Sequence, residues 1–246
     1  MDRAIYLAMN GAKQIHLAQG ANANNMANAA TTAFKADLAQ FRSQPVFGPV
    51  HPSRVYAMTE RPGVDLSTAA LQPTGRDLDV AIDGEGWLTV LGKDGKEALT
   101  RAGDLQVTAQ GQLVTGSGLA VVGNGGPIAL PPYQKLEIGS DGTVSIIPQG
   151  GNATVMAAVD QIKLVNPPKD QLEKGEDGLM HVKGGQPAAA SPRVRLLTGN
   201  LEASNVNIVE QMVQMIDLQR QYEMHIKLMK SVEDDGAASS QLLKLG

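Results

Sequence analysis

The sequence predicts an α+β fold that is mainly β, with paired N- and C-terminal helices forming a coiled-coil-like stalk and the middle of the chain forming an all-β domain. Three observations predict it: apolar residues at helical spacing near both ends, short alternating strands separated by glycine turns, and prolines in the segments between them. The expected order is helix, connector, β domain, connector, helix.

A long helix is expected from Ser204 to about Asp235, because apolar residues recur there at alternating steps of four and three. Asn207 can cap its first turn, Glu210 can complete a capping box, and Gly236 offers a stop. This spacing is typical of a helix that packs along another helix. The seam positions, of which only Gln219 is polar, are Ile208, Met212, Met215, Gln219, Tyr222, Ile226 and Met229.

A second helix is expected from Met1 to about Phe41, with a seam that is mostly alanine. Each buried methylene contributes only about 0.8 kcal/mol, whereas ordering a residue costs about 1 to 2 kcal/mol of backbone entropy. Pairing of the two terminal helices alone therefore does not cover this cost, and we expect both to become ordered only in contact with partner chains.

The expected boundaries divide the chain into four parts. Residues 1–41 together with 201–246 form a terminal helical domain, and residues 76–185 form the β-rich domain. Residues 42–75 form an extended connector, because spaced prolines exclude a long helix, and residues 186–200 form the return connector. The prolines of the first connector are Pro45, Pro49, Pro52, Pro62 and Pro73.

The β domain is expected to contain several tight hairpins. Asp94-Gly95, Gln110-Gly111 and Asp141-Gly142 are the predicted turns, since Asp-Gly is a strong hairpin signal. Strands are expected over residues 77–83, 87–91, 98–101, 105–108, 113–115, 119–122, 135–138, 143–147, 155–165, 179–182 and 193–197.

The composition argues against several classes of protein. A formal net charge of -4, without a run of Lys or Arg, argues against nucleic acid as a partner. The chain has no cysteine, which removes disulfides, thiolate catalysis and cysteine-based metal sites. No run approaches the roughly 18 apolar residues that span a bilayer, and the N-terminal residues lack the pattern of a cleaved signal peptide. We therefore expect a protein that does not span a membrane.

An acidic cluster at residues 77–85 could be taken for a metal or glycosidase site. Alternation places Asp77, Asp79 and Asp83 on the solvent face of a strand, beside Glu85. The calcium-loop pattern fails because Ala81 and Ile82 stand where a ligand and a glycine are required. We interpret the cluster as a solvated strand face.

The remaining candidates for chemistry are the histidines and a glycine-rich stretch. The histidines lack zinc spacing, and residues 116–126 are not followed by the Gly-Lys-Ser/Thr of a phosphate loop. We therefore expect no catalytic, metal-binding or cofactor-binding residues, no cofactor and no enzyme activity. The histidines are His16, His51, His181 and His225.

Three segments carry a resemblance to a known family. Residues 23–35 read ANNMANAATTAFK, which resembles the N-terminal signature of the bacterial flagellar axial proteins, the rod and hook family. The run LEASNV at residues 201–206 resembles the family's second signature, and residues 77–107 resemble the opening of its β domain. Ala33 replaces the usual glycine before Phe34, and alanine disfavours a positive-φ turn.

The resemblance implies a structural subunit of the proximal rod that transmits motor torque. In this family the terminal helices pack with those of neighbours into the inner tube of a helical assembly. Members leave the cell through the flagellar type III export apparatus without a cleaved signal peptide, and the rod of the basal body spans the periplasm. The implied partners are other rod proteins and further copies of the chain.

The subunit interface implied by the resemblance and the helix seam lies on the terminal segments. Its residues are Ile5, Ile15, Asn24, Asn25, Ala27, Asn28, Phe34, Lys35, Ser204, Asn205, Val206, Ile208, Met212, Met215, Tyr222, Ile226 and Met229.

Two alternatives stay open on the sequence. Within the same family the chain could be a distal rod or hook subunit. From another class, it could be a soluble β-domain binding module or a hydrolase that works through the acidic strand.

Overall fold

The computed structural model describes residues 4–45, 55–149 and 156–242 of the chain. The chain folds into two compact units. Unit 1 comprises Met1–Ala29, Asp37–Gly63 and Val206–Gly246, and unit 2 comprises Ala30–Ala36 and Val64–Asn205. Pro49, His51 and Pro52, which were considered above, lie outside the described residues.

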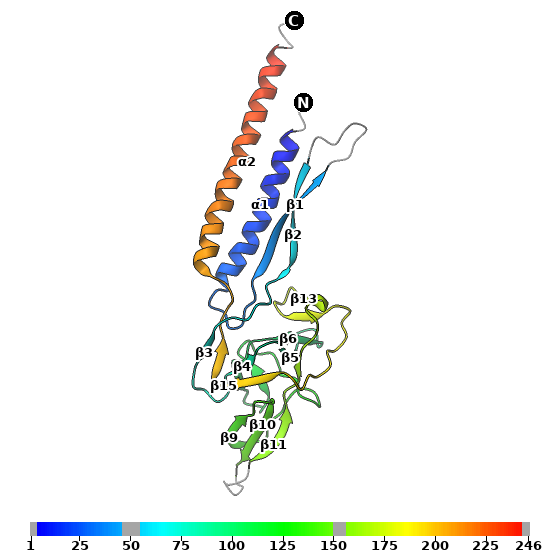
Figure 1. The fold of residues 1–246 in the computed structure, drawn as a ribbon, viewed down its shortest axis with the longest axis vertical. Helices are drawn as coiled ribbons and strands as arrows, with labels where there is room; N and C mark the ends of the chain where they lie inside the picture. Colours follow the sequence, from blue (N-terminus) through cyan, green and yellow to red (C-terminus); the bar gives the residue numbers. More distant parts are fainter. Residues whose placement is uncertain (1–3, 46–54, 150–155, 243–246) are drawn as a thin grey trace. The chain divides into compact units, whose positions relative to one another are not determined.

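Unit 1 consists of two helices and a β-hairpin (Figure 1). Helix α1 spans Ala4–Ala27 and helix α2 spans Ile208–Leu242. Strands β1, Asp37–Pro45, and β2, Val55–Val64, form a two-stranded sheet. Within the part of the chain that the structure describes, neither helix combines the length and apolar character needed to cross a membrane.

Helix α1 is shorter than predicted, and the predicted helix up to Phe41 is wrong beyond Ala27. Asn25 holds the backbone of Asp37: its side-chain carbonyl accepts the Asp37 N–H at 2.8 Å, and its amide donates to the Asp37 carbonyl at 2.9 Å. Asn28 donates its side-chain amide to a carbonyl of the last helical turn at 2.9 Å. These bonds hold the chain away from a continued helix, so it turns and continues as β1.

The two helices of unit 1 pack against each other, but the buried apolar part of their contact is small. Ile15, Ala18 and Leu218 form a buried cluster, against which Ala39 is partly buried. Gly11 allows close approach, because a Cβ at this position would lie only 2.3 Å from Cε1 of His225. Small residues on α1 therefore set the distance between the helices in this region.

The predicted coiled-coil-like stalk of two paired helices is wrong. Unit 1 also contains the β1–β2 hairpin, and the predicted seam of α2 does not form a buried stripe. Ile208, Met212 and Ile226 are 42 to 48% exposed, and Leu218 is the one buried hydrophobic side chain among those described on α2. The α+β chain is mainly β, with two helices and many short strands in several small sheets.

Helix α2 begins at Ile208, directly after the predicted cap residue and four residues later than Ser204, and it ends later than predicted. The side chain of Asn207 accepts the N–H groups of Val209 at 3.1 Å and Glu210 at 3.4 Å, which confirms the predicted cap. The predicted stop at Gly236 is wrong, because α2 continues to Leu242. A glycine inside a helix lowers its stability by only about 1 kcal/mol, so one glycine does not end this helix.

Unit 2 is built from short antiparallel strands (Figure 1). The largest sheet has the strand order β12-β5-β6-β14-β13, a second has the order β11-β10-β9, and the remaining pairs are β15-β4, β16-β3 and β7-β8. The elements of unit 2 are β3 (Leu71–Pro73), β4 (Val80–Asp83), β5 (Trp87–Leu91), β6 (Glu97–Thr100), β7 (Leu105–Val107), β8 (Leu113–Thr115), β9 (Tyr133–Ile138), β10 (Thr143–Pro148), β11 (Ala157–Gln161), β12 (Leu164–Val165), the 3-10 helix η1 (Lys169–Gln171), β13 (Leu172–Lys174), β14 (Met180–Val182), β15 (Arg195–Thr198) and β16 (Asn200–Glu202).

The three predicted hairpin turns are confirmed. They connect β5 to β6, β7 to β8 and β9 to β10. Gly95, Gly111 and Gly142 have φ values of 77°, 82° and 86°, a region that glycine enters without steric cost. Residues 119–122 differ from the prediction, since residues 120–122 form isolated bridges rather than a strand.

The core of unit 2 is aliphatic and includes the segment that precedes α2. β15 pairs with β4, and β16 pairs with β3. Val194 and Leu196 are buried in the main core with Val80 and Ile82. Residues 42–75 and 186–200, which were expected as connectors, thus contain strands.

Candidate functional site: the motif junction and the exposed helix faces

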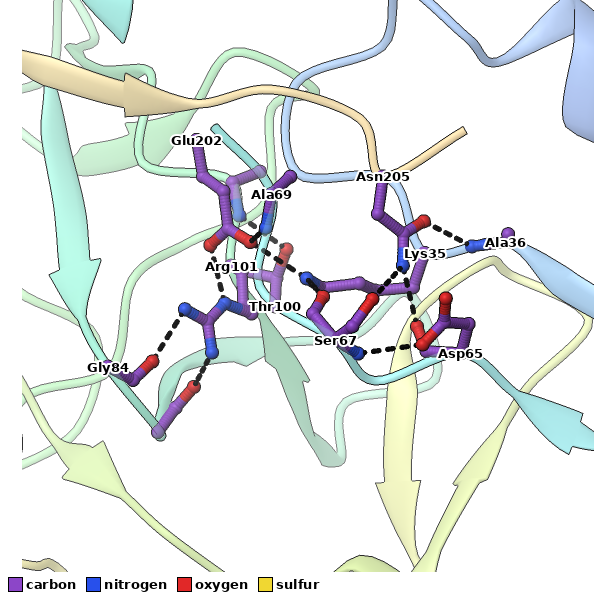
Figure 2. A network of polar contacts seen from close by, with 12 residues as sticks. Lys35, Ala36, Asp65, Ser67, Ala69, Gly84, Thr100, Arg101, Glu202 and Asn205 are labelled. Carbon is purple, nitrogen blue, oxygen red and sulfur yellow. Dashed lines mark hydrogen bonds and ion pairs between the residues drawn. The ribbon is translucent and has the colours of Figure 1, made fainter. Parts of the chain in front are cut away.

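Segments from both family-like motifs meet within unit 2, at a place that we call the motif junction: Lys35, Asp65, Ser67, Arg101, Glu202 and Asn205 (Figure 2). Backbone hydrogen bonds join the two motif segments. The Ala33 N–H donates to the Glu202 carbonyl at 2.8 Å, and the Asn205 N–H donates to the Phe34 carbonyl at 3.2 Å. The N-terminal motif and the C-terminal motif therefore run against each other in unit 2.

A buried ion cluster lies at the centre of the junction. Nζ of Lys35 lies 2.7 Å from Oε1 of Glu202, and Nε of Arg101 lies 2.6 Å from its Oε2. The three side chains are 1 to 3% exposed. The N–H of Ala69 also donates to Oε1, at 3.0 Å. One carboxylate thus neutralises two buried cations from distant parts of the chain.

The two cations are also satisfied by backbone carbonyls. Lys35 donates to the carbonyl of Ser67 at 2.5 Å. Arg101 donates to the carbonyls of Gly86 at 3.2 Å and Gly84 at 2.8 Å (Figure 2). Since these donors are held inside unit 2, the cluster is suited to fixing backbone segments.

The pKa values of the cluster reflect burial and pairing together. Burial would raise the pKa of Glu202, but the hydrogen bonds from Ala69 and Lys35 and the charge of Arg101 lower it below the ordinary glutamate value. Burial lowers the pKa of Lys35, although the hydrogen bond and charge of Glu202 act to raise it. The carboxylate is therefore held in its charged form by the groups around it.

Asn205 binds the backbone of two segments at the junction, one at Ala36 and one at Asp65. Its side-chain carbonyl accepts the N–H of Ala36 at 2.8 Å, and its amide donates to the carbonyl of Asp65 at 2.9 Å (Figure 2). Lys174 places its ammonium 4.1 Å from the centre of the Phe34 ring and donates to the carbonyl of Lys35 at 2.9 Å. Phe34, Lys35 and Asn205, predicted as interface residues, thus make contacts inside the chain.

Ala33 adopts the left-handed conformation, with a φ of 56°. The expectation that alanine would disfavour a positive-φ turn at this position is overturned, because the turn is present with its Cβ buried. The Ala33 N–H bond to Glu202 requires this turn to be kept. The left-handed conformation costs a non-glycine residue about 1 to 2 kcal/mol, which the junction must offset.

Several other predicted interface residues lie inside unit 1. Ile15 and Asn25 are buried, and Asn28 bonds to its own helix. Asn22, which is not among the predicted residues, donates to Gln214 at 3.2 Å. Asn25 also donates to Gln211 at 3.4 Å.

The remaining predicted interface residues have exposed or partly exposed side chains. Asn24, Ala27 and the apolar residues Ile5, Ile208, Met212, Tyr222 and Ile226 are exposed, whereas Ser204, Val206, Met215 and Met229 are partly buried.

Two further apolar stripes were not found from the sequence. On α2, Val209, Val213, Ile216, Met224 and Leu228 are 50 to 65% exposed at spacings of four, three, eight and four residues, on a different side from the predicted seam. On α1, Tyr6, Met9 and Leu17 are 52 to 59% exposed. The spacing of these residues carries the signal, but only one seam was predicted on each helix.

Arg101 and Glu202 were also missed. Both lie in segments that resemble the family, yet neither was given a role. The available signal was a charged residue within each family-like segment, since nothing in the neighbouring residues indicates that the two side chains will meet.

The acidic cluster near β4 agrees only in part with its interpretation as a solvated strand face. Asp77, Asp83 and Glu85 are exposed, but Asp79 is buried, as are all of residues 80–82. β4 pairs with β15 on one edge, and the Val80 N–H donates to the Gly103 carbonyl on the other. The alternation is lost because both faces of this strand are covered.

The acidic side chains themselves are dispersed. Asp79 lies 3.6 Å from the guanidinium of Arg76, and the exposed Glu85 lies 2.7 Å from Lys169. Burial raises the pKa of Asp104, which bridges to Asp79 through the backbone. Within the described residues, no group of three or more His, Asp or Glu is placed to hold a metal ion.

Two family models match the chain. The model described as the flagellar hook protein FlgE/F/G D1 domain matches residues 81–146, which include much of the core of unit 2. The model described as the flagellar basal body rod FlgEFG protein C-terminal region matches residues 197–242, which include Glu202, Asn205 and α2. These matches define a class, the rod and hook proteins of the bacterial flagellum.

Individual relatives narrow this class. The flagellar basal-body rod protein FlgF of Escherichia coli (strain K12) is 39% identical over 251 aligned residues, which cover 100% of this chain and 100% of that protein. FlgF of Salmonella typhimurium has the same identity and coverage. FlgG of Bacillus subtilis is 32% identical over 95% of this chain and 96% of that protein. The chain belongs to the FlgF family of flagellar basal-body rod proteins.

Proposed function

We propose that this chain is a structural subunit of the flagellar basal-body rod, in its proximal part, and that it transmits motor torque without catalysis of its own. The observation that carries the proposal is the apolar surface of α2. Its exposed hydrophobic residues occupy two different sides of the helix, while Leu218 alone is buried among the described hydrophobic side chains of α2. Surface of this kind is typical of a protein–protein interface.

The helix faces support assembly with copies of the chain and with other rod proteins. A helix that is apolar on more than one side is stable when several neighbours cover it. Contacts between different surfaces of neighbouring subunits generate open helical assemblies. Unit 1 offers such different surfaces, since α1 exposes Tyr6, Met9 and Leu17, and α2 exposes two further stripes.

The predicted interface residues take two roles in this proposal. The exposed residues of α1 and α2, such as Ile5, Met212 and Ile226, contact neighbouring subunits. The residues that bond within the chain, such as Asn25 and Lys35, instead hold the segments that precede and follow those helices. The family signature would thus contribute to assembly indirectly.

Location and export are part of the same proposal. Membership of the FlgF family supports a place in the basal body, and from it we infer a rod segment in the periplasm that is exported by the flagellar type III apparatus. The same membership favours a rod subunit over a soluble binding module or a hydrolase.

The interface is tested by placing one charge on either of two surfaces of α2. Ile226→Asp puts a carboxylate on the exposed apolar seam, and Gln221→Asp adds the same charge at an exposed polar position away from that seam. In cells whose own copy of the gene is deleted, we expect Ile226→Asp to abolish rod assembly and motility and Gln221→Asp to support both. Motility with Ile226→Asp at normal protein levels would contradict the proposed interface.

A further inference from the structure

Glu202 is the one anion of the buried ion cluster that it forms with Lys35 and Arg101, and it lies near the C-terminal end of unit 2 in the sequence. Lys35 lies 167 residues before it and Arg101 lies 101 residues before it. Without the Glu202 carboxylate, the two cations would be buried near each other. Their remaining partners would be backbone carbonyls, the Trp87 ring beside Arg101 and the charge of Asp65 acting on Lys35. An uncompensated buried charge is strongly destabilising.

The backbone around Glu202 is equally necessary to the fold. β15 pairs with β4, β16 pairs with β3, and Leu196 fills the main core. The Ala203 N–H donates to the Ala70 carbonyl at 2.9 Å. The same short segment therefore supplies two strand pairings, a core side chain and the counter-charge.

We propose that Glu202 and the strands before it act as a latch that closes unit 2 only when both terminal motifs are present. The sheet region next to the junction does not become stable on residues 64–193 alone, since Arg101 follows β6 directly and binds the carbonyls before β5. Contacts this distant in sequence form late, because closing the intervening loop costs entropy before any contact is gained.

The latch has a consequence for export, and this consequence alone rests on the proposed function. A chain that is exported unfolded keeps unit 2 open until both motifs have left the channel. Folding of unit 2 does not depend on which end of the chain emerges first, because neither motif stabilises unit 2 without the other.

The test follows amide protection while the purified full chain refolds from urea. The probes for the sheet are the N–H groups of Thr89 and Leu91, which bond to Lys163 and Ala120. The probes for the latch are the N–H groups of Ala33 and Ala203. In the wild-type chain we expect all four to become protected in one kinetic phase. Protection of Thr89 and Leu91 in an earlier phase than Ala203 would overturn the latch.

A variant pair tests the charge itself at equilibrium. Glu202→Gln keeps the shape and removes the charge, and we expect it to lower protection at Thr89 and Ala203 together by about 100-fold or more. Glu137→Gln breaks an exposed ion pair of unit 2 with Lys135 and should change protection less than threefold. If protection fell at Ala33 and Ala203 but stayed unchanged at Thr89, Glu202 would stabilise only the segments next to it, and the proposal would be overturned.

Two features keep this test interpretable. If Glu202→Gln fails to fold, the order in which amides become protected in the wild-type chain still tests the proposal. Glu202→Asp retains the charge, and we expect its amide protection to be intermediate between that of wild type and that of Glu202→Gln. The measurements use the isolated chain. They therefore succeed or fail independently of Ile226→Asp and rod assembly.

Discussion

The motif junction and the outer faces of α1 and α2 use opposite physical means. At the junction, charged side chains are buried and paired within one chain, with Glu202 and Lys35 at 1 and 3% exposure. On the helices, apolar side chains such as Val209 and Met224 are 60% exposed or more. The junction is complete in a single chain, whereas we propose that other subunits cover the exposed helix faces.

This difference divides the residues that had been grouped as one interface. Phe34, Lys35 and Asn205 bond within unit 2, while Met212 and Ile226 remain open to a partner. A family signature can therefore consist of residues that stabilise the fold of one subunit as well as residues that contact neighbouring subunits. Substitutions at the junction and on the helices separate these two roles.

The largest effect is expected from removing one cation of the junction. Lys35→Ala leaves Glu202 with a single charged partner in a site that excludes water, so we expect unit 2 to lose about 3 to 5 kcal/mol of unfolding free energy. Lys135→Ala, which breaks the exposed pair with Glu137, should leave urea unfolding unchanged. Equal losses of unfolding free energy in the two variants would mean that the buried pair at the junction stabilises the fold no more than an exposed ion pair does.

The next effect concerns the helix contact of unit 1. A methyl group at Gly11 would collide with His225, so Gly11→Ala should destabilise unit 1 by about 1 to 3 kcal/mol. The matched control is Gly20→Ala on the same helix, where nothing lies within 4 Å of the added Cβ. We expect this control to stabilise α1 by about 0.5 to 1 kcal/mol.

Thermal unfolding followed by helical circular dichroism measures both variants. A melting temperature that rises in Gly11→Ala as it does in Gly20→Ala would show that α1 and α2 do not approach closely at His225. The double variant Gly11→Ala/His225→Ala should recover part of the loss, because the collision is removed.

Acid should weaken the junction through Glu202. Its pKa is lowered on folding, so its contribution to stability is fully present above the ordinary glutamate pKa of about 4.3 and is lost as the pH falls through the lower folded value. Wild type should thus lose more unfolding free energy than Glu202→Gln as the pH falls below about 4.5. The raised pKa of Asp104 acts with the opposite sign in both proteins and cancels in this difference. Parallel urea stability curves for the two proteins across this pH range would refute the assignment.

The smallest effect is expected at the strained turn before the junction. Ala33→Gly relieves the positive φ at the cost of greater freedom in the unfolded chain, for a net gain of about 0.5 to 1 kcal/mol. Ala36→Gly, which changes the same side chain where no positive φ is present, should instead lower stability slightly. The midpoint of urea unfolding distinguishes a gain from a loss.

Local features were predictable from the sequence, and long-range ones were not. The turns at Gly95, Gly111 and Gly142 and the cap at Asn207 depend on a few adjacent residues, and each was found. The end of α1 was missed because it depends on Asn25 binding Asp37, which no helical period reveals.

The junction and β4 were missed for the same reason. Lys35 and Glu202 meet across 167 residues, and a single sequence carries no signal for that pairing. Asp79 and Ala81 alternate with apolar residues as in a half-exposed strand, but tertiary contacts cover both faces of β4. For the candidate site, composition and spacing identified one apolar seam of α2, while the second seam and the buried ions required the structure.

The most direct test compares hydrogen exchange of the full chain as a verified monomer and in assembled rods. We expect the amides of α1 and α2 to exchange faster in the monomer than in the rod, while Ala33 and Ala203 at the junction are protected in both. Strong protection of α2 in the monomer, unchanged on assembly, would contradict the claim that these helix faces are the subunit contacts.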